Sequence, residues 1–151
     1  MLRLNTRLLA NCVEGLSDEQ AARRPVPPAN SAVFLVAHLV DSRHFLLTML
    51  GGSSPNPVAP YLADARGIDD VRRLPPLPEL LAVWASVSAA LNDRLASVEP
   101  AALDAPSGQR FAIDDRSVLG GLAFLVQHDS YHIGQLAMLR RQHGLPAMRY
   151  T

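Results

Sequence analysis

Residues 117–143 read SVLGGLAFLVQHDSYHIGQLAMLRRQH, and this stretch decides the fold. Its apolar residues recur at intervals of three and four, which is the period of one face of an α-helix. We predict a helix that begins at Ser117 and ends before Gly144, with Pro146 beyond the end. At the usual rise such a helix is about 39 Å long, which suits a helix bundle.

Three further segments have the same helical period, and clusters of proline separate them. The first spans about residues 2–15. The second begins at Asn30 or Ser31, either of which can cap it, and ends at the glycine pair 51–52. The third begins at Pro78, because proline is favoured at the first position of a helix.

The composition agrees with a helical protein. Leu and Ala together make up 45 of the 151 residues, whereas Ile and Thr contribute three each, and strands usually select β-branched and aromatic residues. We therefore predict a single domain over residues 1–151, an all-α four-helix bundle with long inter-helix connections, whose third helix packs through Trp84. Residues 52–76 are enough to span the bundle, so consecutive helices need not be antiparallel.

Charge and cysteine content restrict the partners and the compartment. Fourteen basic residues balance fourteen acidic ones without a basic cluster, so we expect neither a nucleic acid nor a membrane as partner. Cys12 is the single cysteine, which excludes an intrachain disulfide and fits a reducing compartment. The first residues lack the apolar run of a signal peptide, and no run approaches the roughly 18 apolar residues of a membrane span. The expected location is cytoplasmic.

The histidines carry the strongest chemical signal. His128 and His132 are four residues apart, so both rings project from one face of the helix, and that face is the apolar one. Ordinary hydrogen bonds can hold such an interior pair, but His38, in the middle of the second helix, adds a third inward imidazole. Three histidines from two facing helices match a three-ligand site for a divalent metal, with water at an open position. His44 and His143 are predicted to lie outside this site, His44 either at the surface or as a satellite of the site.

Two blocks of sequence make a family recognisable. The block HDSYHIGQLAMLRRQHGLPAM over residues 128–148, together with AHLVDSRHFLL around His38, resembles the DinB/YfiT-like superfamily of metal-dependent enzymes. The resemblance implies a four-helix bundle that binds one divalent ion, zinc or nickel, through His38, His128 and His132. It also implies a homodimer. Characterised members include thiol-dependent S-transferases and isomerases that use mycothiol, bacillithiol or glutathione.

Three functions are compatible with these residues, and the sequence does not separate them. The first is a metal-dependent enzyme that transfers a low-molecular-weight thiol, as co-substrate, to a small-molecule electrophile. The second is a hydrolase in which the metal ion activates water, and the third is a non-catalytic module that binds a small molecule through the metal. No catalytic residue is assigned. Neither histidine motif contains glutamate, unlike the HExxH motif of metalloproteases, so peptidase chemistry ranks low.

Further side chains are candidates for contacts around the metal or with substrate. Gln135 follows His128 by one heptad, so it can hydrogen-bond a ligand or pack between helices. Asp41 can orient an imidazole or bind metal-bound water, or it can be an exposed charge at the helix edge. Tyr131 can donate to a substrate or to a main-chain carbonyl. Gly134 is expected to permit the close approach of a neighbouring helix, because glycine otherwise disfavours a helix interior.

Overall fold

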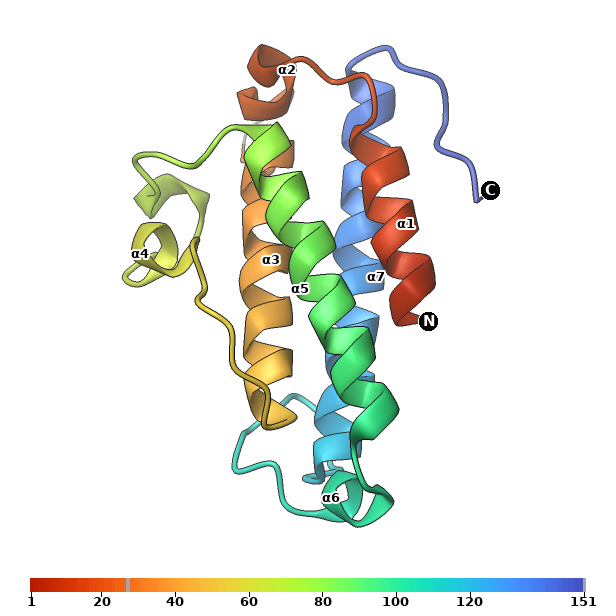
Figure 1. Ribbon diagram of the computed structural model, residues 1–151. Coiled ribbons are helices and arrows are strands. Elements are labelled where there is room, and N and C mark those ends of the chain that lie inside the picture. The colour runs from red at the N-terminus through yellow and green to blue at the C-terminus, as the bar shows by residue number, and fades with distance from the viewer. Residues whose placement is uncertain (27, 151) are drawn as a thin grey trace.

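Four long helices lie side by side and form the body of the protein (Figure 1). The computed structural model describes residues 1–26 and 28–150, and it contains helices but no β-strand in these ranges. The prediction of an all-α fold is therefore confirmed, while Pro27 and Thr151 lie outside the described residues. The long helices are α1 (Leu2–Val13), α3 (Ala32–Met49), α5 (Leu77–Ser97) and α7 (Val118–Gln142).

The long helices are not all antiparallel to their neighbours in the chain. Helix α1 packs against α5 and α7, and α3 packs against the same two helices from the other side. Figure 1 shows α1 and α7 running in one direction and α3 and α5 in the other. Because α3 and α5 are parallel, the α3–α5 connection (residues 50–76) must return along the whole bundle, as the length of this segment allows.

Short helical elements lie within the connections between the long helices. Helix α2 begins with a capping box, in which Ser17 Oγ accepts from the Gln20 N–H and Gln20 Oε1 accepts from the Ser17 N–H, at 3.1 and 3.0 Å. This arrangement satisfies two donors at the helix end. The short elements are α2 (Asp18–Ala22), α4 (Ala59–Leu62), the 3₁₀ turn η1 (Ile68–Asp70) and α6 (Pro100–Asp104).

Helix α3 is the most apolar element. The expectation that no segment approaches the length of a membrane span is wrong for this helix, which could cross a membrane by length and composition alone, but 61% of it is buried inside the described structure. Helices α5 and α7 cover it, which is the behaviour of the central helix of a bundle. On α5, Trp84 is buried, and its indole N–H donates to the Thr6 carbonyl at 3.1 Å, so the third long helix does pack through Trp84.

Close helix packing occurs at a different glycine from the predicted one. A Cβ added to Gly121 would lie 2.6 Å from the Phe111 ring and 3.0 Å from the Met49 side chain, so any larger residue would force these side chains to shift. A Cβ added to Gly134 would meet nothing within 4 Å. The prediction for Gly134 is therefore wrong, because this residue lies on an exposed face of α7.

A buried ion pair joins α3 to α7. Arg43 is 1% exposed and Asp129 2%. The Arg43 Nε and Nη2 atoms both donate to Asp129 Oδ2, at 3.2 and 2.9 Å. Burial raises the pKa of Asp129, and the Arg43 charge opposes that shift. Two charges are stable in such a place only when their remaining polar atoms are also satisfied.

The other helices supply those partners. Arg43 Nη1 donates to Thr6 Oγ1 at 2.6 Å and to Ser88 Oγ at 2.5 Å, and Nη2 donates to the Leu2 carbonyl at 3.2 Å. The guanidinium carbon also lies 3.7 Å from the centre of the Trp84 ring, in cation–π contact. One side chain of α3 thus binds residues of α1, α5 and α7.

We predict that Asp129→Ala unfolds the bundle far more easily than a matched surface variant. Removal of the carboxylate leaves the Arg43 charge buried and unpaired, which costs about 3–5 kcal/mol of unfolding free energy. The control is Asp69→Ala, which breaks the Arg24–Asp69 pair, where Asp69 is 78% exposed; an exposed pair contributes about 0–1 kcal/mol. Urea unfolding followed by circular dichroism measures both, and equal losses would contradict the prediction.

Candidate metal centre

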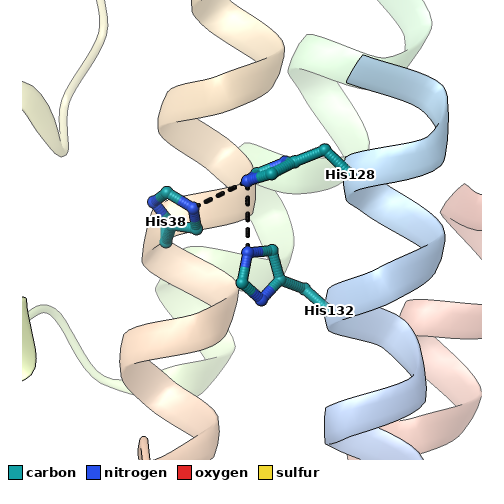
Figure 2. A group of neighbouring side chains, drawn as sticks. All are labelled: His38, His128 and His132. Atoms are coloured by element: carbon teal, nitrogen blue, oxygen red, sulfur yellow. Dashed lines mark hydrogen bonds between the residues drawn. The ribbon is translucent and has the colours of Figure 1, made fainter. Parts of the chain in front are cut away.

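Three imidazoles converge between α3 and α7. His38 comes from α3, and His128 and His132 come from successive turns of α7 (Figure 2). His128 Nε2 lies 3.0 Å from His38 Nε2 and 3.1 Å from His132 Nε2. Each residue offers one nitrogen to a group whose atoms all lie within 4.8 Å of one another. The structure therefore brings together the three histidines that the helical periodicity selected.

Gln135 fixes the orientation of one ring. His132 Nδ1 lies 2.8 Å from Gln135 Oε1. An amide oxygen can only accept, so Nδ1 carries the proton, and the Nε2 lone pair of His132 faces the other two rings. A hydrogen bond of this kind is the usual way in which proteins orient a metal-binding imidazole. Gln135 thus lies in the place from which it can position a ligand.

Aromatic rings cover the other two imidazoles. Phe34 stacks on His38, with ring centres 6.2 Å apart and planes 3° from parallel. Phe124 stacks on His128 at 6.5 Å. The Nδ1 atom of His128 is buried and has no hydrogen-bond partner among the described residues. The site is therefore partly desolvated on the side of the helices.

Burial favours the neutral form of these rings. It lowers the pKa of His128 to about 4, with further contributions from the positive forms of His132 and His38. Burial also lowers the pKa of His38, as does His132, while the Asp41 carboxylate acts in the opposite direction. Imidazole binds a metal only when deprotonated, so His38 and His128 are in the binding-competent state at neutral pH.

The donor set fits a cation. A neutral imidazole nitrogen either carries a proton or offers one lone pair, so His128 Nε2 can complete a hydrogen bond with only one of its two neighbours. A cation between the rings would satisfy all three lone pairs at once. A tetrahedral ion with bonds of about 2.0–2.1 Å holds its nitrogens roughly 3.3 Å apart, and the two short nitrogen–nitrogen distances, 3.0 and 3.1 Å, are within a few tenths of that value.

An open cleft of about 520 Å³ gives access to the site. His38, His132 and Asp41 line it together with residues of the α3–α5 connection. Asp41 is half-buried, and its Oδ1 atom accepts a hydrogen bond from Asn56 Nδ2 at 2.7 Å. It is therefore not the freely exposed helix-edge charge that was one of its two expected roles.

Tyr131 lies at the outer edge of the site. Its ring contacts that of His132, with centres 5.0 Å apart, but the side chain is 58% exposed. Its hydroxyl makes no hydrogen bond to any described residue. Donation to a bound molecule remains a prediction for this phenol, whereas donation to a main-chain carbonyl is not observed.

His44 lies outside the group of three histidines, as predicted, but not at the surface, which was one of its two expected positions. It is buried, with 5% of its surface exposed, and burial lowers its pKa. It lines a separate pocket of about 250 Å³ with Ser54 and Asn56, at the beginning of the α3–α5 connection. The expected surface position was based only on the angle between His44 and His38 around the helix axis. The α3–α5 connection covers the side of α3 that carries His44.

Cys12 and His143 agree with the sequence analysis. Cys12 is buried in the core, where its thiol donates to the Ile133 carbonyl at 3.7 Å, and burial raises its pKa to about 11. A thiol of this kind is inert rather than nucleophilic. His143 is the C-terminal cap of α7, away from the three clustered histidines.

The fold and the histidine group together fit a class of helical proteins that hold a metal ion between their helices. A family model of the DinB superfamily matches residues 1–136, which include His38, His128 and His132. The chain therefore belongs to the DinB superfamily. No protein of curated function matches the chain.

We predict that His132→Ala removes the bound metal and leaves the bundle folded. The substitution deletes one of three ligands but touches neither the Arg43–Asp129 pair nor the buried core. The matched control is His143→Ala, which also removes one histidine from α7's C-terminal end. Elemental analysis after dialysis should find about one ion per chain in the control and none in His132→Ala. An unchanged metal content in His132→Ala would exclude the site.

Proton release provides a second prediction. At about pH 5.5, three histidines of ordinary pKa would be mostly protonated and would release nearly three protons on binding a metal. Because the pKa values of His38 and His128 are lowered, we expect clearly fewer than three. Calorimetric titration with zinc in buffers of different ionisation enthalpy counts the protons. A release of three would mean that the rings are not desolvated in this way.

Proposed function

We propose that this DinB-superfamily protein is a metal-dependent enzyme that transfers a low-molecular-weight thiol to an electrophilic small molecule. The observation that carries the proposal is the donor set, three imidazoles without a carboxylate, beside an open cleft. A divalent ion held there would keep its full positive charge and would lower the pKa of a thiol that reaches it. The ion in this proposal is either zinc or nickel, since both bind imidazole.

The thiol must come from a second molecule. Cys12 is the only cysteine of the chain, and its burial and raised pKa exclude it as nucleophile. In the transfer, the thiol loses its proton to solvent and its sulfur forms a bond to an electrophilic carbon. The leaving group departs from that carbon with the bonding electrons, so charge and atoms balance.

Residues of the chain orient the histidine ligands and shield the site from water. Gln135 holds the His132 ring, and Phe34 and Phe124 keep water away from the helix side of the site. The cleft has a volume of about 520 Å³, within the usual range for small-molecule pockets, roughly 300–1,000 Å³. Cytoplasmic location and a homodimer remain predictions alongside this function.

The test is conjugation of monochlorobimane to glutathione, bacillithiol or mycothiol. We expect the metal-loaded protein to accelerate the loss of monochlorobimane with at least one of these thiols, and we expect His128→Ala to abolish the acceleration. His143→Ala, which lies outside the site, should keep it. If no thiol reacts faster than in the metal-free control, the thiol-transferase proposal is wrong, and a hydrolase or a binding module becomes the better explanation.

A further inference from the structure

The cleft beside the histidines contains one positive and one negative side chain. Asp41 comes from α3, and Arg66 comes from the α3–α5 connection. Among the described residues that line the cleft, they are the only carboxylate and the only guanidinium. The lining residues are Asn30, Phe34, His38, Asp41, Leu62, Ala65, Arg66, Gly67 and His132.

The guanidinium of Arg66 is available to a ligand. It makes no ion pair or hydrogen bond with the described part of the chain. Seven of the fourteen arginines differ in this respect, because their side chains donate to other described residues: Arg43 binds Asp129, for example, and Arg94 donates to the Leu50 carbonyl. An arginine that lines a cleft without a partner is suited to a carboxylate, which its planar fork can bind through two hydrogen bonds.

The segment that carries Arg66 is held in place. The main-chain N–H of Arg66 donates to Asp70 Oδ2 at 2.8 Å. Asp69 forms an ion pair with Arg24, a residue that comes just before the proline-rich segment preceding α3. Ile68 is half-buried and packs against the hydrophobic core. The exposed Arg66 side chain thus projects from a segment whose backbone is bound to Asp70 and whose Ile68 is anchored in the core.

Asp41 offers the opposite charge. Asn56 engages only its Oδ1 atom, so Oδ2 is left for a second donor. The charge of Asp41 acts on His38, where it opposes the lowering of the pKa. Because His38 and His132 line the same cleft, a group bound between Asp41 and Arg66 lies next to these imidazoles.

We infer that the cleft selects thiols that carry both an ammonium and a carboxylate group. Arg66 binds the carboxylate, Asp41 binds the ammonium, and the sulfur points toward the three histidines. This inference rests on the proposed thiol transfer and narrows its substrate class. Cysteine, glutathione and bacillithiol have both charged groups, whereas mycothiol has neither. Arg66 is then a residue that determines specificity.

A series of small thiols tests each charge separately. Cysteine has both groups, cysteamine lacks the carboxylate, N-acetylcysteine lacks the ammonium, and N-acetylcysteamine lacks both. Monochlorobimane, the electrophile, has no carboxylate, so any dependence on charge belongs to the thiol. Comparing each thiol between variants of the metal-loaded protein cancels the different intrinsic reactivities of the thiols.

For Arg66→Met we expect KM for cysteine and N-acetylcysteine to rise about tenfold, as for the loss of a hydrogen bond to a charged group. The kcat values and both parameters for cysteamine should not change. Asp41→Asn keeps an oxygen for Asn56 and should raise KM for cysteine and cysteamine only. The control Arg72→Met removes a neighbouring exposed arginine that does not line this cleft, and it should change none of these values.

A binding measurement separates this inference from the proposed reaction. S-methylglutathione has both charged groups but no free thiol, and calorimetry should show weaker binding to Arg66→Met than to the unaltered protein or Arg72→Met. If no thiol reacts but this difference is found, the transferase function fails and the recognition stands. If thiols do react and Arg66→Met affects all of them equally or none of them, or if mycothiol is used as well as glutathione, the inference is overturned; it is also overturned if S-methylglutathione binds Arg66→Met as tightly as it binds the unaltered protein.

Discussion

The guanidinium of Arg43 binds residues from the three other long helices, and its ion pair with Asp129 is the constraint on which the rest of the site depends. Asp129 follows His128 directly, and adjacent residues of a helix are about 100° apart around its axis. Holding Asp129 against α3 therefore fixes the rotation of α7. With that rotation set, His128 and His132 can only face the side of α3 that carries His38 (Figure 2).

This rigidity explains how three neutral imidazoles can lie so close together. His128 Nε2 has two nitrogen neighbours and can satisfy only one, and His128 Nδ1 is buried without a partner. Such an arrangement costs free energy unless a cation occupies the centre. The pair of Arg43 and Asp129, with every donor of the guanidinium engaged, joins the helices through contacts that do not involve the histidines. A preorganised site of this kind loses little entropy on binding.

Periodicity in the sequence was sufficient to find the helices and the three histidines, because both depend on local geometry. The pair of Arg43 and Asp129 was missed, since its members are 86 residues apart and meet only through the order of the helices. The burial of His44 was missed for a related reason: whether a side of α3 is exposed depends on where the connection runs. Arg66 and Asn56 stand in irregular chain, where no periodicity predicts which side chain reaches the cleft.

The parallel arrangement of α3 and α5 links the fold to the substrate cleft. A chain that leaves the end of α3 must return along the whole bundle before α5 can begin in the same direction, and residues 50–76 make this return beside α3 (Figure 1). Helix α3 carries His38 and Asp41, so the returning segment necessarily passes close to them. The long connection that the parallel arrangement requires thus also carries two residues of the cleft region. Asn56 holds Asp41, and Arg66 completes the cleft. An antiparallel α3–α5 pair would need only a short turn, and the histidines would then face solvent without a wall to select what binds beside them.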